Sequence, residues 1–487
     1  MLLQVDRLRL AAPFALAALL LGAGVGRASD GPAPAFFGAR GPVALPAGGD
    51  PQTAYRMPSG IGWSLEHQID LDVFFVYFTA TAKNALNDVD KDGVGAAMSF
   101  GAIIVPDVDV PVRLHVGLYP DQGALAPSRT RVRYTTFPDK VGLKVDSVFF
   151  SVATSLVFAP TPWLSIGASL HVIPTYSRQL LVLGGGGQRL ELAGSPQING
   201  VPLPGNPTYA DFLDLVPNDA TDPTLFYDSR AYGLHVSGLV SVTLAPLPDL
   251  AIGLAYRPRS LEAVPLTGEA RIDAGRTLSS ALASLDPSLQ ALFLSTLPNG
   301  GTRGFEADYD LKQEGPYVPQ SVRLSLAWWP TERLLLAGEV AWTEWSRAFK
   351  SAKVTLTDGS NEDFNFVVGG DRVVVKAQTR WKNRWTASTQ VAFRVTPDLT
   401  LRAGAHWGVS PLNPDPVGSI GTPAFACTSV MGGAGIQLTD DVQLNGLLEW
   451  VFRASARSGS NTGAVTTDNT RYTSGQVNLH LGVSIWF

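Results

Sequence analysis

The chain of 487 residues carries 37 Lys and Arg against 42 Asp and Glu, a formal net charge of -5. Charged residues make up only 16% of the chain, against about 25% in ordinary soluble domains. After the N-terminus no apolar run reaches the length of a membrane-spanning helix, about 20 residues. The mild acidity and the lack of Lys/Arg clusters argue against nucleic-acid binding. This combination is typical of a transmembrane β-barrel.

The first 28 residues have the features of a secretory signal peptide. Arg7 and Arg9 precede an apolar run over residues 10–25, and small residues around Ala28 suit a cleavage site. The run is short for a spanning helix. We therefore expect residues 1–28 to direct export rather than to anchor the chain.

Six short polar turns separate segments in which apolar and polar residues alternate. Pro presets the backbone φ angle and Asp or Thr can hydrogen-bond to local amides, which suits both to turns. The other connections are longer and polar, for example residues 177–230 and 257–320. Short turns at one end and long loops at the other are typical of outer-membrane barrels. The short turns are at residues 106–109, 160–162, 246–249, 330–332, 396–398 and 439–441.

These six turns account for twelve strands, and a first strand near residues 63–80 and a last near 472–487 raise the predicted total to fourteen. The number is even, as in bacterial single-chain barrels. We therefore expect an all-β fold, a transmembrane antiparallel barrel of about 14 strands with long outer loops, over residues 63–487.

The alternation predicts which side chains meet lipid, because successive side chains of a strand face opposite sides of the sheet. In the last strand the odd positions 477–487 are apolar or aromatic, and the even positions 476–484 hold Gln, Asn, His, Gly and Ser. The apolar set should face lipid and the polar set the lumen. A soluble β-sandwich would alternate in the same way.

Tryptophan positions distinguish the two classes. A tilted spanning strand needs about 9–11 residues, and aromatic rings gather at both bilayer interfaces. Some tryptophans lie beside short turns, and four lie about one strand length away. Their spacing predicts two aromatic girdles. The four distant ones are Trp342, Trp385, Trp407 and Trp450.

The same alternation places six charged side chains in the lumen. Counted symmetrically from Thr331, two of them, Arg323 and Glu339, should face each other across a hairpin and stabilise one another. The set is either a structural charge network or includes one or two arginines that bind a ligand carboxylate through paired N–H donors. The six are Arg323, Glu339, Arg394, Arg402, Glu449 and Arg453.

The outer loop 277–297 is unusually apolar for a solvated loop. Its large apolar residues recur at intervals of three and four, as on a helix face, although Pro287 interrupts them. Exposed at a barrel mouth, they would capture hydrophobic molecules; alternatively, they pack only against each other. The capture candidates are Leu282, Leu285, Leu289, Leu292 and Phe293.

One segment matches the start of a calcium-binding loop, with Asp88, Asp90 and Asp92 before Gly93. The twelfth position is Ser99, not the Glu that completes an EF-hand. The segment lies in the predicted first outer loop, where an ordinary acidic turn is the alternative.

Signals for catalysis are weak. The six histidines are dispersed without metal-ligand spacing. The chain has no phosphate-binding glycine loop, and its single cysteine, Cys427, cannot form an intramolecular disulfide. We expect no enzyme activity, no cofactor and no direct energy coupling.

Several segments resemble one family, the FadL/TodX (OmpP1) outer-membrane transporters of hydrophobic compounds. The most specific is residues 340–349, VAWTEWSRAF, which resembles the family strand W-T-x-W-S-x-F. Residues 381–385, WKNRW, are similar to its W-K-D-x-W segment, and residues 163–168, WLSIGA, to its W-L-S-L-G-A strand start. Residues 408–412, GVSPL, resemble its D-x-S-P-V segment. The resemblance extends over about residues 40–487.

The resemblance implies a fourteen-stranded barrel plugged by a small N-terminal hatch. Residues 29–62, rich in Gly, Pro and Ala, are the candidate hatch, and a disordered leader is the alternative. Where the family has N-P-A-G-L, the Asn is missing here. The corresponding residues are Met57, Pro58, Ser59 and Gly60.

We therefore expect a passive channel in the outer membrane of a Gram-negative bacterium, which takes up hydrophobic small molecules such as long-chain fatty acids or hydrocarbons. The resemblance implies release through the hatch or sideways through the wall. Expected partners are the ligand, the bilayer with its lipopolysaccharide, and the barrel assembly machinery, for which the terminal Phe487 is suited. We expect a monomer that binds no nucleic acid. A general porin for polar solutes and a structural or adhesive barrel remain alternatives.

Overall fold

A computed structural model gives the fold. The signal peptide predicted for residues 1–28 and Cys427 lie outside the residues that it describes. The described residues are 40, 42–47, 49–85, 88–120, 128–132, 141–183, 194–198, 201–205, 207–209, 225–260, 265–283, 285–314, 318–348, 351–378, 381–411, 428–459 and 469–487.

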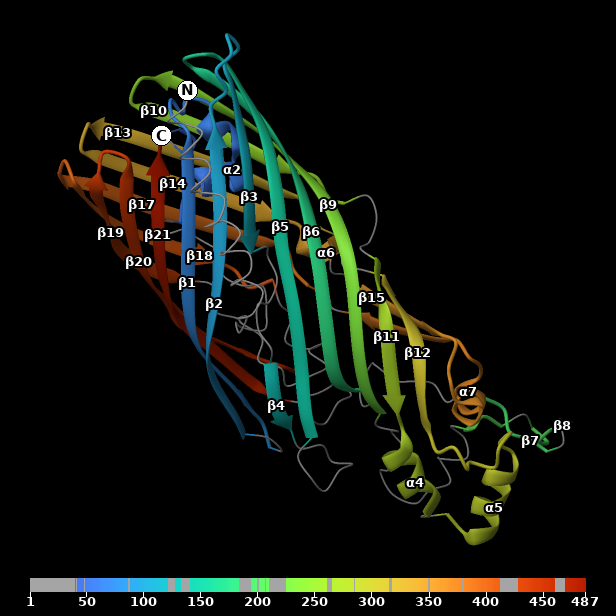
Figure 1. Cartoon of the computed structure of the whole chain (residues 1–487). Helices are drawn as coiled ribbons and strands as arrows, with labels where there is room; N and C mark the ends of the chain where they lie inside the picture. Colours follow the sequence, from blue (N-terminus) through green and yellow to red (C-terminus); the bar gives the residue numbers. More distant parts are fainter. Residues whose placement is uncertain are drawn as a thin grey trace.

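Fourteen of the described strands form a closed antiparallel barrel (Figure 1). Each pairs with the next around the wall, and the last strand pairs with the first from Gln68↔Trp486 to Lys83↔Arg471. The predicted number of strands is therefore confirmed. Around the barrel they are β1 Gln68–Lys83, β2 Asp88–Ile104, β3 Val112–Pro120, β5 Val141–Thr161, β6 Leu164–Leu183, β9 Leu225–Leu247, β10 Leu250–Arg257, β13 Ser321–Thr331, β14 Leu334–Thr343, β17 Arg384–Thr396, β18 Leu399–Gly408, β19 Ser429–Thr439, β20 Val442–Arg457 and β21 Arg471–Trp486.

All six predicted short turns connect neighbouring strands of this barrel. They lie at the same end as the C-terminus, at the upper left of Figure 1. In outer-membrane barrels the short turns are periplasmic and the long loops are extracellular. We call these the periplasmic end and the outer end.

The two faces of the wall follow the predicted alternation. In β21, Leu479 and Leu481 are exposed on the outside, whereas His480 between them is buried. Aromatic side chains are exposed at both ends of the wall, for example Trp163 beside a short turn and Trp450 on the outer half of β20. No helix in the described part of the chain is both long and apolar enough to cross a membrane.

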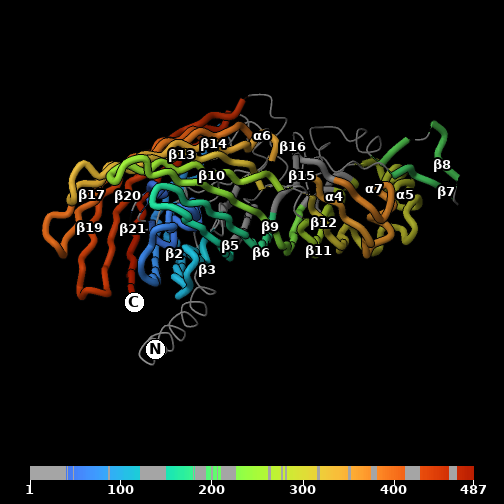
Figure 2. The backbone as a smooth tube through the Cα atoms, turned by 90° about the horizontal axis from the view of Figure 1, so that it is seen from above, coloured from blue at the N-terminus to red at the C-terminus, as the bar shows by residue number. Residues whose placement is uncertain are grey.

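At the outer end the sheet continues beyond the barrel into a separate lobe, at the lower right of Figure 1 and on the right of Figure 2. We call residues 194–209, 265–314 and 351–378, where described, the outer lobe. A hairpin, β4 Ser128–Val132 on β5, and a short helix, α6 Trp345–Ala348, lie elsewhere at the outer end. The lobe contains β7 Gln197–Ile198, β8 Val201–Pro202, β11 Pro265–Asp273, α4 Gly275–Ala283, α5 Pro287–Ser295, β12 Glu306–Glu314, β15 Ser351–Thr357, α7 Glu362–Val368 and β16 Val373–Gln378.

The outer lobe has a hydrophobic core of its own, in which Leu278, Phe293 and Phe364 are fully buried. Its helices begin at conventional caps. The side chain of Asp286 accepts a hydrogen bond from an amide of the first turn of α5, and that of Asn361 does the same for α7. The lobe is therefore a packed unit and not a set of solvated loops.

The N-terminal segment, residues 40–62 where described, folds into helix α2 Pro51–Arg56 and the 3-10 helix η1 Pro58–Ile61. It packs against lumen-facing side chains at the periplasmic end, where Figure 1 shows α2 among the strands. Ala54, Met57 and Ile61 are fully buried there. Pro at the first position of each helix suits its start, because the missing N–H has no partner in that turn anyway.

Candidate functional site

The carboxylate of Glu339 on β14 joins the N-terminal segment to the barrel wall. Its Oε1 accepts hydrogen bonds from Arg56 Nη2, at 2.7 Å, and from Arg323 on β13. Its Oε2 accepts a hydrogen bond from the Ala44 amide at 2.9 Å. Arg56 also donates through Nη1 to the Pro42 carbonyl at 3.0 Å. One buried carboxylate therefore binds two points of the segment and one cation of the wall.

The contact between Arg323 and Glu339 was predicted, but the strand register was not. Arg323 pairs with Ala341, and Glu339 pairs with Ser325, so the two charged residues meet diagonally. The turn of this hairpin is Glu332 and Arg333, because Thr331 pairs with Leu334, so the hairpin is centred beyond Thr331 and not on it. The prediction that the two residues lie directly opposite each other was wrong.

Ser59, within the segment that resembles the family hatch motif, is bound to the wall by three hydrogen bonds. Its amide donates to Ser241 Oγ at 2.8 Å, and its hydroxyl pairs with Thr243 at 2.8 Å. Its carbonyl accepts from Ser165 Oγ at 2.9 Å. These bonds satisfy the polar groups of a residue that is fully buried.

Glycines in the wall make room for this approach. A Cβ at Gly167 on β6 would lie 2.6 Å from the Ser59 nitrogen, and a Cβ at Gly253 on β10 would lie 2.3 Å from the sulfur of Met57. A larger residue at Gly167 would therefore displace the backbone of the segment, whereas one at Gly253 would displace the side chain of Met57.

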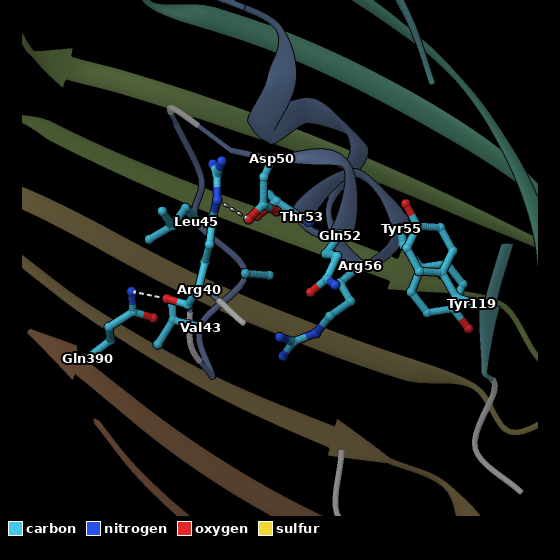
Figure 3. A pocket seen from close by; sticks show the side chains of 11 residues that line it. Arg40, Val43, Leu45, Asp50, Gln52, Thr53, Tyr55, Arg56, Tyr119 and Gln390 are labelled. Carbon is cyan, nitrogen blue, oxygen red and sulfur yellow. Dashed lines mark hydrogen bonds and ion pairs between the residues drawn. The ribbon is translucent and has the colours of Figure 1, made fainter. Parts of the chain in front are cut away.

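A small pocket lies between the segment and the wall (Figure 3). The Tyr119 hydroxyl on β3 donates to the Pro51 carbonyl at 2.7 Å, and its ring stacks on Tyr55 of α2 with 4.5 Å between centroids. On the other side, Gln390 of β17 donates to the Arg40 carbonyl at 3.0 Å. The segment thus contacts widely separated strands of the wall.

Of the remaining lumen candidates, Arg402 and Glu449 bind wall residues. Arg402 donates to Asn445 Oδ1 at 2.8 Å. Glu449 is 1% exposed and accepts from Ser429 Oγ at 2.6 Å and from Asn478 Nδ2 at 2.7 Å. These contacts favour the first of the two interpretations of the lumen charges, a structural network, for Arg402 and Glu449.

Two candidates do not lie in the buried lumen. Arg394 has inward parity but is exposed beside the periplasmic turn. Arg453 falls in an irregularity of β20 between Val451 and Ala454, which breaks the alternation. Its Cγ approaches Gly475, whose position on β21 belongs to the lipid-facing set. The predicted inward orientation of Arg453 was therefore wrong, because two residues of the bulge oppose one of β21.

An aromatic surface on the lumen side of β1 was not predicted from the sequence. Phe74, Val76 and Phe78 are buried there and pack against Phe150 of β5. Phe74 also stacks on His480, with 5.7 Å between ring centroids. The signal was the run VFFVYF in β1, which is apolar on both faces where a wall with a polar lumen would alternate.

The five apolar residues proposed to capture substrate at the outer loop are buried or partly buried, whereas capture requires that they be exposed. Leu282, Leu285 and Phe293 are buried in the core of the outer lobe, and Leu289 and Leu292 are partly buried against it. Helices α4 and α5 turn their apolar faces inward because the lobe is large enough to bury them. The structure therefore favours the alternative, that these residues pack against their own lobe.

The acidic segment is a strand and not a loop. Asp88, Asp90 and Asp92 lie on β2, where the backbone is extended and cannot form the tight turn of a calcium loop. Lys83 of β1 contacts Asp88 at 2.9 Å and Asp90 at 3.9 Å. Within the described residues, no group of His, Cys, Asp and Glu is arranged to hold a metal.

Two segments used for the family resemblance meet in space. Trp345, at the start of α6, packs against Trp381 with 5.4 Å between ring centroids. Residues 214–480 match the model of one family, the outer membrane transport proteins (OMPP1/FadL/TodX), over more than half of the chain. The chain belongs to this family. Membership places it in the outer membrane of a Gram-negative bacterium as a transport protein.

Solved structures of the family have the same fold. The Pseudomonas putida toluene transporter TodX is 16% identical, with a TM-score of 0.65 over 95% of this chain and 100% of that one. The Ralstonia pickettii toluene transporter TbuX is 14% identical, with a TM-score of 0.63 over 94% and 98%. A Pseudomonas aeruginosa FadL homologue is 15% identical, with a TM-score of 0.63 over 95% and 99%. No curated protein sequence matches the chain significantly.

Proposed function

We propose that this outer-membrane transport protein takes up hydrophobic small molecules, by passive diffusion and without catalysis. The observation that carries the proposal is the aromatic surface of Phe74, Val76 and Phe78 on the lumen side of β1. A porin for polar solutes gains nothing from apolar side chains on the lumen side of its wall, whereas a hydrophobic solute that leaves water for such apolar surroundings is stabilised. Two of the similar structures are toluene transporters, which favours monoaromatic hydrocarbons within this substrate class, alongside long-chain fatty acids.

We also propose that the N-terminal segment acts as a hatch. The contacts of Glu339, Ser59 and Tyr119 with it support this role, because they join the segment to β14, β6, β9 and β3. Substrate would leave when these contacts open or sideways through the wall. We further propose that the protein is a monomer and that the barrel assembly machinery recognises its C-terminal residue, Phe487.

Uptake by whole cells tests the substrate class. Labelled toluene, a labelled long-chain fatty acid and a labelled sugar are compared in cells with and without the protein. We expect the protein to raise uptake of at least one of the two hydrophobic compounds and to leave that of the sugar unchanged. Raised sugar uptake without raised uptake of either hydrophobic compound would refute the proposal and favour a general porin.

Deletion of residues 29–62 tests the hatch. The barrel should still fold, because its strands pair with each other in a closed ring. We expect greater leakage of small polar solutes, measured as conductance in planar bilayers. Unchanged conductance of the folded deletion variant would refute the hatch and support a leader that does not close the lumen.

A further inference from the structure

Three cationic side chains lie next to one another on neighbouring strands at the outer end of the barrel. Arg457 of β20 is directly opposite Arg471 of β21, and Arg471 is directly opposite Lys83 of β1. All three are exposed. By the alternation of β1 and β21, their side chains are on the outer face, the same face as Leu479 and Phe75.

Like charges directly opposite each other on a sheet destabilise it. Lys83 is compensated by Asp88 and Asp90. Arg457 and Arg471 make no ion pair with any residue in the described ranges. The exposed Arg453, which the bulge turns toward the outer face beside Gly475, makes none there either. Three guanidinium groups without a carboxylate partner in the described part of the chain therefore share one patch of the outer face.

The patch lies directly above the lipid-exposed band. On the same strands, Trp450, Val477 and Tyr77 form one cross-strand row, with Trp450 56% and Tyr77 46% exposed. Exposed aromatic rings of this kind mark the bilayer interface. Arg471 lies six residues beyond Val477, about 20 Å along the strand, or about 15 Å above the row for a strand tilted about 40°. Arg453, opposite Gly475, lies between the two levels.

We propose that Arg453, Arg457 and Arg471 form a binding site for the phosphate groups of lipopolysaccharide. In the outer leaflet these groups extend from the bilayer interface outward through the inner sugar core, which matches the heights of the three arginines. Guanidinium groups bind phosphate through paired N–H donors, and such an anion relieves the repulsion between Arg457 and Arg471. The acidic side chains on β2 limit the site to the β20–β21 side of the patch.

The test is the affinity of the purified full-length barrel, in non-ionic detergent with a metal chelator, for fluorescent rough lipopolysaccharide that retains the phosphorylated inner core. The chelator removes divalent cations that would bridge phosphate to the Asp side chains of β2. The variant R453Q/R457Q/R471Q is compared with the control R178Q/R230Q/R271Q, which removes three outward arginines from β6, β9 and β11. Those arginines already have carboxylate neighbours, Asp228, Glu269 and Glu306.

We expect the first variant to lose about tenfold or more in affinity, and the control to stay within about twofold of the wild type. Heat-dependent mobility in gels verifies that each barrel is folded. Equal affinity of the first variant and the wild type would overturn the proposal. So would equally tight binding of dephosphorylated lipopolysaccharide, or equally effective competition by phosphatidylglycerol micelles.

Discussion

Glu339 in the barrel wall and Arg56 in the N-terminal segment are 283 residues apart in the sequence and 2.7 Å apart in the structure. Arg323 shares the same carboxylate oxygen. The side chain of Glu339 is 3% exposed, against 12% for Arg56 and 19% for Arg323. Removing the carboxylate would leave two partly buried cations facing each other, so the pairing contributes to holding the segment against the wall.

Glu339→Gln should loosen the N-terminal segment without unfolding the barrel. Breaking a fully buried ion pair costs about 3–5 kcal/mol. We expect a value at or below the lower end of this range, because the amide keeps part of the hydrogen bonding and both arginines retain some exposure. Leakage of small polar solutes should rise, as conductance in planar bilayers would show.

Glu449→Gln is the matched control for this prediction. Glu449 is an equally buried lumen carboxylate, but its hydrogen bonds go to Ser429 and Asn478 in the wall. It should leave conductance close to that of the wild type. A rise as large in this variant as in Glu339→Gln would mean that any loss of lumen charge opens the channel.

The strands of the barrel could be predicted from the sequence because their signals are local. Turn residues and the two-residue alternation mark each strand, as in β21, where polar residues such as Asn478 and His480 alternate with apolar ones. The alternation fails where a bulge adds a residue. Arg453 was assigned to the wrong face for this reason, whereas the register of Arg323 was misjudged because the turn of its hairpin is centred beyond Thr331.

The contacts of the candidate site could not be predicted in the same way. No periodicity relates Arg56 to Glu339 or Ser59 to Ser241, because these pairs form only when the closed wall surrounds the segment. The apolar residues of the outer lobe were found, but the sequence left open whether they are exposed or packed against each other. Whether Phe293 faces water or a core depends on β11, β12 and α7, which are distant in sequence.

Phe78→Asn should reduce uptake of a hydrophobic substrate. Phe78 belongs to the aromatic surface on the lumen side of β1, and a hydrophobic solute that packs there and removes about 40 Å² of its own apolar area from water gains about 1 kcal/mol, or about fivefold in rate at low concentration. Initial uptake rates of labelled toluene measure the effect. Tyr77→Asn, one residue away but on the outer face at 46% exposure, is the control and should transport normally. If both variants transport like the wild type, the β1 surface is not on the path of the substrate.

Asp363→Ala should destabilise the outer lobe. Its buried carboxylate accepts hydrogen bonds from the Asn299 amide at 2.6 Å and the Gly301 amide at 3.1 Å. Gly301 has a φ of 75°, a conformation that the bonds help to hold. A fully buried amide without a partner costs about 1–3 kcal/mol, and these two half-buried amides should cost less, so hydrogen exchange of residues 299–304 should accelerate. Glu362→Ala, next to it but with only a 3.3 Å contact to the exposed side chain of Asn299, should change the exchange little. Equal protection in Asp363→Ala and in the wild type would contradict this account.

The outer lobe should lose stability in alkali because of Tyr209. Its buried ring contacts Phe293, and its hydroxyl is hydrogen-bonded to Thr296 Oγ1 at 2.9 Å. Burial raises the pKa of Tyr209 from 10.0 to about 12. Below pH 10 the hydroxyl keeps its proton in both states, and between pH 10 and pH 12 only the unfolded lobe releases it. Stability is therefore lost as the pH rises through this window, by at most about 1.4 kcal/mol per pH unit.

Subtilisin cleavage of the outer lobe, followed between pH 8 and pH 11, measures this loss, since cleavage tracks the population of the opened lobe. The comparison is with Tyr209→Phe, which keeps the ring and removes the titrating group. Burial also raises the pKa of the Tyr309 hydroxyl on β12, so the variant should retain part of the pH dependence and show a shallower rise in cleavage rate above pH 10. A rise as steep as that of the wild type would show that Tyr209 titrates alike in the folded and unfolded lobe.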